Sequence, residues 1–203
     1  MRNIRRLFSL VLFIFVTTAV SFVTTAVSAQ EPIRPLTKRV FVKTNVLSLL
    51  AKRPTFSVEK AFSKTFSTEV SFVQGQFNNF LLTDHYDYKG LLIRAKKYFI
   101  GLDYGAVSPY VAVYAGNLKR HIQTTGQVDN TGFWGYPDRN FSANSIRGGG
   151  SLGFAYFTKS KFVLDGQGSL GYGRYLNIDK SDPDTYFKGY LDVQVWLSIG
   201  YCF

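Results

Sequence analysis

Two histidines, His85 and His121, are the side chains of this 203-residue sequence best suited to move a proton near neutral pH. A serine nucleophile activated by histidine also needs a carboxylate that orients the imidazole. His85 directly follows Asp84, but the sequence contains no His-Ser dipeptide. We therefore predict a non-enzymatic protein with no catalytic residues. The enzymatic alternative is a lipid-modifying enzyme that uses His85 or His121.

Patterns that would hold a metal ion or a phosphate group are incomplete. Asp179, Asp182 and Asp184 lack the D-x-D-x-D-G spacing of a calcium loop. The glycine run 148–150 lacks the G-K-[ST] that completes a phosphate loop, and inside a strand it would permit curvature or close backbone approach. A single cysteine, Cys202, can form neither an intrachain disulfide nor a multi-cysteine metal site. We expect no metal and no cofactor.

Charged residues recur on the polar side of segments in which apolar and polar residues alternate. A period of two is typical of β-strands, because successive side chains point to opposite faces. An eight-stranded barrel has an interior just wide enough for side chains, so charges of both signs would pair there. We expect this packed network to fill the lumen, and a narrow ion path is the alternative. Its predicted members are Lys43, Glu59, Glu69, Arg94, Lys96, Arg147, Asp165 and Asp192.

The alternation is clearest in residues 190–203, where every second residue from Leu191 is apolar. Most of the alternating segments reach the roughly 9–11 residues that a tilted strand needs to cross a bilayer. The sequence therefore predicts an all-β fold, an eight-stranded antiparallel up-and-down transmembrane β-barrel. The other seven predicted strands are residues 38–50, 55–62, 66–74, 90–100, 109–122, 141–157 and 161–176.

Long polar connections are predicted at residues 75–89, 123–140 and 177–189, and shorter turns at the opposite end. Short inner turns and long outer loops are typical of outer-membrane barrels. Aromatic residues next to Asn and Asp are common on recognition surfaces, but they can equally pack loops against one another. The first interpretation gives a loop-mediated surface receptor or adhesin with an unidentified extracellular ligand. Its candidate residues are Phe77, Phe80, Tyr86, Trp134, Tyr136 and Tyr186, with Tyr88 beside them.

The first 29 residues have the pattern of a secretory signal peptide. Three arginines precede an apolar run over residues 7–20, and Val-Ser-Ala at 27–29 offers a cleavage site. We predict a cleaved signal peptide at 1–29, an extended lead-in at 30–37 and a β-barrel domain at 38–203. The formal net charge is +11, but the basic residues are scattered, so no nucleic-acid partner is expected. The predicted location is the cell outer membrane, with membrane lipids as partners.

The stretch from residue 43 onward resembles the start of an uncharacterised family of outer-membrane barrel proteins from Bacteroidota. The resemblance rests on Lys43, Asn45, Leu47, Pro54, Glu59 and Ser63, with Val46 where the family has a leucine after the asparagine. It implies an eight-stranded barrel of the OmpA/OmpX type and no established chemistry. The last strand also resembles the C-terminal signal read by the barrel-assembly machinery. Tyr201 and Phe203 are the residues of this signal, and the machinery is the partner expected during biogenesis.

Overall fold

The computed structural model of the chain describes residues 34–36, 39–80, 83–125, 127–128, 135–136, 139–180 and 188–203. Most of these residues lie in β-strands, which confirms the all-β prediction. One short 3-10 helix, η1 (Val46–Ala51), interrupts them. The strands are β1 (Arg34–Pro35), β2 (Val40–Asn45), β3 (Phe56–Ala61), β4 (Phe66–Phe80), β5 (Thr83–Tyr98), β6 (Asp103–Tyr104), β7 (Val107–Thr124), β8 (Gln127–Val128), β9 (Gly135–Tyr136), β10 (Arg139–Phe157), β11 (Phe162–Lys180) and β12 (Gly189–Cys202).

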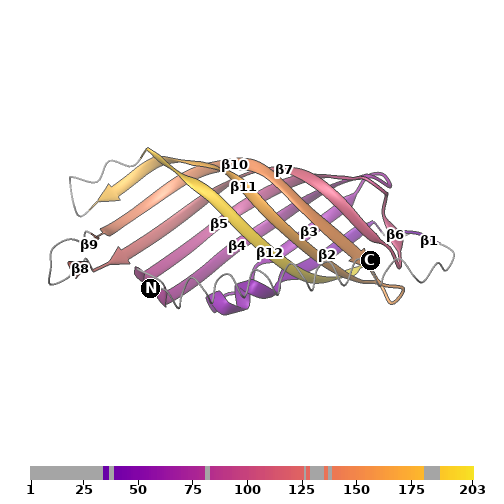
Figure 1. The fold of residues 1–203 in the computed structure, drawn as a ribbon, viewed down its shortest axis with the longest axis horizontal. Helices are drawn as coiled ribbons and strands as arrows, with labels where there is room; N and C mark the ends of the chain where they lie inside the picture. Colours follow the sequence, from indigo (N-terminus) through magenta and orange to yellow (C-terminus); the bar gives the residue numbers. More distant parts are fainter. Residues whose placement is uncertain are drawn as a thin grey trace.

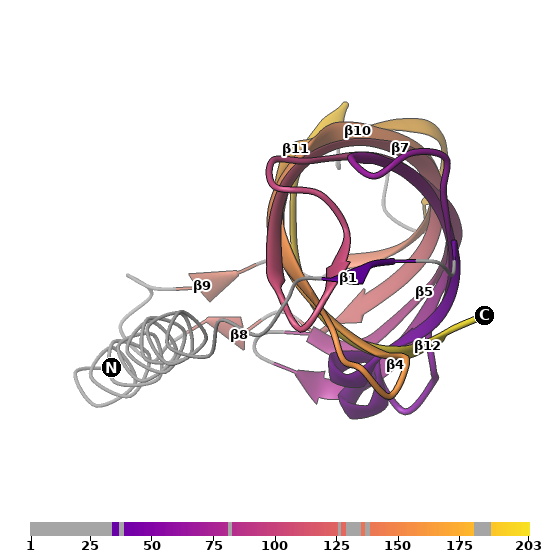
Figure 2. The ribbon, with the colours of Figure 1, turned by 90° about the vertical axis from the view of Figure 1, so that its right-hand side faces the viewer.

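The long strands pair into one mostly antiparallel sheet that closes on itself. Its order runs β10-β11-β12-β2-β3-β4-β5-β7, and β7 pairs again with β10. The strands are tilted in side view, and seen along the axis they curve into a ring (Figures 1 and 2). β6 and β1 extend the sheet beyond this ring, while β8 and β9 pair separately. No helix among the described residues is long and apolar enough to cross a membrane.

The ring has two ends that differ in their connections. We call the loop end the one where β4 joins β5, β7 joins β10 and β11 joins β12. We call the turn end the one where β3 joins β4, β5 joins β7 and β10 joins β11. The last strand, β12, begins at the loop end and pairs antiparallel with β2. This pairing joins a strand from late in the sequence to one from early in the sequence.

Residues along each strand alternate between an inner face, pointing into the ring, and an outer face. In β12, Leu191, Val193 and Val195 are exposed, whereas Asp192 and Trp196 between and after them are buried. This alternation is what the sequence pattern of 190–203 predicts, because parity alone decides the face of a strand residue. In β7 the sequence pattern does not decide the faces, because Tyr110 and Tyr114 alternate with Val111 and Val113. The structure places Tyr110 and Tyr114 inside and Val113 outside.

The predicted first strand, 38–50, is wrong in its second half. The strand ends at Asn45, whose side-chain Oδ1 accepts a hydrogen bond from the Leu47 amide at 3.1 Å and caps η1. Ser48 then donates to the Asn45 carbonyl at 2.6 Å and accepts from the Thr55 amide at 2.9 Å. These local bonds replace strand pairing, because Asn and Ser side chains compete for backbone groups.

The predicted long loops are also wrong in extent, since strands continue into all three. Most of 75–89 belongs to β4 and β5, which pair as far out as Phe80 with Thr83. β7 continues to Thr124 and β10 begins at Arg139, while β11 reaches Lys180. The sequence does not predict these extensions, because their composition is mostly polar. A strand without an apolar face lacks the alternation by which strands are recognised.

An apolar cluster fills the inner face at the turn end. Phe41, Tyr98, Phe157 and Cys202 are buried there, and the Phe41 and Phe157 rings lie 5.2 Å apart. The lead-in packs onto this cluster through Leu36, whose amide donates to the Leu102 carbonyl at 3.1 Å. β1, paired with β6, is seen within the outline of the ring in Figure 2. Remaining apolar members are Ala61, Leu102, Tyr110, Ala112, Ala155 and Val163.

Candidate functional site

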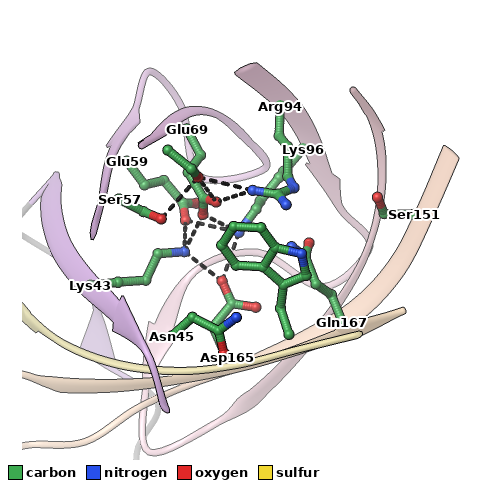
Figure 3. Close-up of polar contacts among 12 residues, drawn as sticks. Lys43, Asn45, Ser57, Glu59, Glu69, Arg94, Lys96, Ser151, Asp165 and Gln167 are labelled. Atoms are coloured by element: carbon green, nitrogen blue, oxygen red, sulfur yellow. Dashed lines mark hydrogen bonds and ion pairs between the residues drawn. The ribbon is translucent and has the colours of Figure 1, made fainter. Parts of the chain in front are cut away.

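A cluster of five ionised side chains lies on the inner face, next to the apolar cluster at the turn end. The Lys43 ammonium contacts Glu59 and Asp165 at 2.5 Å each, and it also pairs with Glu69. The Lys96 ammonium contacts the same carboxylates at 3.0 Å to Glu59, 2.8 Å to Glu69 and 2.7 Å to Asp165. The five side chains come from β2, β3, β4, β5 and β11 and converge in Figure 3.

Arg94 completes the cluster and balances its charge. Its Nη1 donates to Glu69 Oε1 at 2.8 Å and to Ser71 Oγ at 2.9 Å. Its guanidinium also stacks on Trp196, with Cζ 4.0 Å from the ring centroid. Three cations thus face three carboxylates (Lys43, Lys96 and Arg94 against Glu59, Glu69 and Asp165). Ionised groups are retained in a protein interior only when paired and hydrogen-bonded in this way.

Neutral donors satisfy the remaining carboxylate oxygens. Tyr98 donates to Glu59 Oε1 at 2.7 Å, and Ser67 donates to the same oxygen at 2.5 Å. Tyr110 donates to Asp165 Oδ1 at 2.6 Å. A hydrogen bond to a charged acceptor is stronger than one between neutral groups, so these hydroxyls hold the carboxylates in place.

The three carboxylates bring oxygen atoms within 4.8 Å of one another, a spacing that a metal ion can use. Two ammonium groups already contact these oxygens, and with Arg94 they balance the negative charge. A cation added there would bring uncompensated positive charge into a buried site. The cluster therefore suits internal ion pairing, and the chemistry of its donors gives no reason to propose a metal.

The two other predicted network residues, Arg147 and Asp192, lie closer to the loop end. Arg147 Nη1 is 3.3 Å from Asp192 Oδ1, and Tyr114 donates to Asp192 Oδ2 at 2.9 Å. Gln194 links this pair to the main cluster, since its amide donates to Asp192 at 2.7 Å and its oxygen accepts from Arg94 at 3.3 Å. The structure thus buries all eight predicted residues, six in one cluster and two in a linked pair.

The sequence prediction named the charges but missed the neutral residues that join them. Tyr98, Tyr110, Tyr114, Gln194 and Trp196 all contact the network. Each has the same parity along its strand as the charged residues beside it. Parity places these residues on the inner face but does not show that they join the network, because tyrosine and tryptophan also suit a lipid interface.

The aromatic residues expected in loops divide into strand residues and residues outside the described part of the chain. Phe77 and Tyr86 lie on paired strands, with rings stacked at 6.4 Å. Phe80 is also a strand residue, at the end of β4. Trp134 and Tyr186 lie outside the described residues, as does the side chain of Tyr136. For Phe77, Phe80 and Tyr86 the loop assignment is wrong.

Both histidines lie near the loop end, on neighbouring strands. His121 Nδ1 is 2.8 Å from Ser142 Oγ, a contact that the sequence did not predict. His85 Nε2 is 2.6 Å from Asp87 Oδ2, and the two imidazole rings lie 6.4 Å apart. A hydrolytic triad needs the carboxylate on the histidine that faces the serine. Here the aspartate contacts the other histidine, so the arrangement is incomplete as a triad.

Tyr201 and Phe203 are exposed at the turn end. Their rings lie 5.2 Å apart, and Tyr201 also packs edge-on against Phe162 at 5.6 Å. The Phe203 amide donates to the Val40 carbonyl at 2.8 Å, which holds the last residue beside the start of β2. The two aromatic side chains therefore belong to an exposed aromatic group at this end of the ring.

Comparisons with known proteins give a family and a distant structural similarity. A family model described as a protein of unknown function (DUF3575) matches residues 12–187. No curated protein matches the chain. Among solved structures, the chain is similar to a major outer membrane protein from Thermus thermophilus, at 12% identity and a TM-score of 0.42. That similarity covers 83% of this chain and 100% of the other.

Proposed function

The chain belongs to the DUF3575 family of proteins of unknown function, and from that premise we propose that it is a small integral protein of the outer membrane. In this proposal the ring is an eight-stranded transmembrane β-barrel. It has no enzymatic activity and acts in envelope structure, as a scaffold for the segments at its loop end.

One observation carries the proposal: the outer face is apolar while the charges lie inside. Leu191, Val193 and Val195 are 69%, 63% and 59% exposed, although Asp192 between them is only 5% exposed. Soluble proteins rarely expose large contiguous apolar surfaces. Transfer of one such side chain from water into lipid would stabilise the protein by about 1.5–3 kcal/mol. Other exposed apolar residues of the outer face are Val42, Phe56, Val58, Val70, Leu91, Ile93, Val113, Ile146, Leu152, Phe154, Leu164, Leu170, Leu197 and Ile199.

Closure of the ring supports the same conclusion. Each of β2, β3, β4, β5, β7, β10, β11 and β12 has a hydrogen-bonded neighbour on both sides. Hydrocarbon offers no partner for an unpaired backbone group, so strands can cross a membrane only when the sheet has no edge. A soluble sheet can instead keep open edges and protect them with charged side chains, short strands or a covering segment.

The filled interior favours a scaffold over a pore. Two clusters together occupy the inner face at the turn end: the ionic cluster, which includes Lys96, and the apolar cluster, which includes Phe157. A conducting path would have to separate paired charges that are each only 0–4% exposed. Separating one partner from a buried pair costs about 3–5 kcal/mol, so an open path would be rarely populated.

The proposed orientation places the loop end outside the cell. Bacterial outer-membrane barrels have short periplasmic turns and longer extracellular connections. The turns at the turn end are short, for example residues 62–65 between β3 and β4. The leader predicted at residues 1–29 supports export to this location.

Fractionation with gel electrophoresis tests the membrane assignment. We expect the mature protein to fractionate with outer membranes, to need detergent for extraction and to migrate differently before and after heating. Lipid A and phospholipid profiles are compared in the same cells with and without the protein. Recovery of a soluble, folded monomer without detergent would contradict the membrane assignment, and a changed lipid profile would contradict the non-enzymatic one.

A further inference from the structure

Arg120 lies on the inner face of β7 near the loop end, surrounded by tyrosine side chains. Its Cζ is 3.7 Å from the ring centroid of Tyr190 and 5.8 Å from that of Tyr175. β7 does not pair with β12, so the contact with Tyr190 spans the inside of the ring. Tyr88 is the direct neighbour of Arg120 across the β5–β7 pairing.

The charge of Arg120 has no counterpart among the described residues. The main cluster is balanced, and Arg147 pairs with Asp192 at 3.3 Å. Arg120 forms no ion pair within the described ranges, and its buried Nε has no hydrogen-bond partner there. The Nε of Arg147 is likewise buried without a partner in this part of the chain. A buried donor left without an acceptor is unfavourable, and more so when it is charged.

The Tyr190 ring beside the guanidinium is held in place by its own packing. A Cβ on Gly173 would lie 2.2 Å from the Tyr190 ring, so glycine makes room for that ring. Tyr190 is fixed at its hydroxyl, which lies 3.0 Å from Ser145 Oγ. Arg120 and the rings around it are half-buried, so part of this group of side chains remains open to solvent.

From this geometry we infer that Arg120, with Arg147 and the surrounding tyrosines, binds an oxyanion, either a phosphate or a carboxylate group carried on a small solute. Guanidinium groups form paired hydrogen bonds with both kinds of oxyanion. Such a ligand would supply the missing negative charge and accept from the unpartnered Nε atoms. The aromatic rings would hold Arg120 in position while it exchanges one anion for another.

Binding itself needs only the folded ring, whereas access from outside the cell rests on the proposed function. The two can fail separately. Calorimetric titration of purified, detergent-solubilised protein tests the site, with inorganic phosphate and acetate as probes. We expect saturable binding of at least one probe below about 10 mM. Inorganic phosphate without acetate would assign the site to phosphates, and acetate alone would assign it to carboxylates.

Arg120→Gln should weaken binding at least tenfold. Arg174→Gln is the matched control, because Arg174 is an exposed arginine on the outer face of β11 and the same charge is removed. Heat-modifiable migration of each variant reports folding. If Arg120→Gln does not fold, Arg120→Lys keeps the charge, removes the fork and should still weaken binding. Equal affinity in wild type and the Arg120 variant, equal weakening by both glutamine variants, or no saturable binding of either probe would overturn the inference.

Discussion

Lys43 and Lys96 hold their ammonium groups against the same three carboxylates, although they belong to strands that do not pair with each other. Two like charges are held in one site because Glu59, Glu69 and Asp165 together exceed them in charge. Arg94 then supplies the third positive charge, at 2.8 Å from Glu69. Ion pairs on the inner face therefore connect strands that are not neighbours, in addition to the backbone hydrogen bonds that connect neighbouring strands around the ring.

Removing one ammonium should destabilise the ring strongly. Lys96→Met leaves one buried carboxylate uncompensated, and we expect a loss of about 3–5 kcal/mol in the free energy of unfolding. Urea unfolding in detergent, followed by gel migration, measures this loss. Lys97→Met is the control, because Lys97 is exposed on the outer face and donates to Thr65 at 2.9 Å.

Restoring the charge balance should recover part of that stability. The double variant Lys96→Met with Asp165→Asn removes one charge of each sign, so we expect it to be more stable than Lys96→Met alone. The same urea series provides the comparison. If Lys96→Met and Lys97→Met are equally stable, the cluster contributes nothing and this account of the interior is wrong.

A charge on the outer face should be harmful only where lipid is expected. Val195→Arg places a charge midway along the apolar stretch of β12, at a cost of about 2–4 kcal/mol in hydrocarbon. Asn177→Arg, also on the outer face but near the loop end, should cost about 0–1 kcal/mol. The amount of heat-modifiable protein in the membrane fraction distinguishes them. In a soluble protein both arginines would be tolerated, and equal yields of the two variants would argue against the membrane assignment.

The glycine run in β10 should tolerate substitution at one position and not at its neighbour. A Cβ on Gly149 would lie 2.3 Å from the Leu170 carbonyl oxygen and 2.5 Å from Gly171 Cα, both of which are backbone atoms that cannot move aside. A Cβ on Gly150 would meet only the Ala112 carbonyl oxygen, at 3.9 Å. Gly149→Ala should therefore cost about 1–3 kcal/mol, and Gly150→Ala little. Matching unfolding midpoints for the two variants would refute the close-approach explanation.

The histidines should be dispensable for membrane lipid composition. Because Asp87 contacts His85 and not His121, the His121–Ser142 contact lacks the acid of a triad. We expect cells producing the His85→Ala, His121→Ala double variant to have the same lipid A and phospholipid profiles as cells producing the wild type. Ser142→Ala serves as the companion variant. Loss of a lipid product in both would show that the protein is an enzyme.

Sequence alone determined which side chains face inward in strands where one of the two alternating sets is polar. The side of a strand on which a residue lies follows from parity, whatever its neighbours are, so Lys43, Glu59 and Asp192 could be placed inside before any pairing was known. Parity also placed Leu191 and Val195 outside. The all-β class follows from the same period of two repeated along the chain.

The tertiary structure alone decided which inward residues meet and where the strands end. Lys43 and Asp165 are 122 positions apart, and their contact depends on the register and tilt of several strands, which parity does not specify. The extension of β4 and β5 past Gly75 depends on backbone pairing where the apolar alternation has stopped. The approach of Arg120 to Tyr190 likewise requires a closed ring, because their strands are brought together only across its interior.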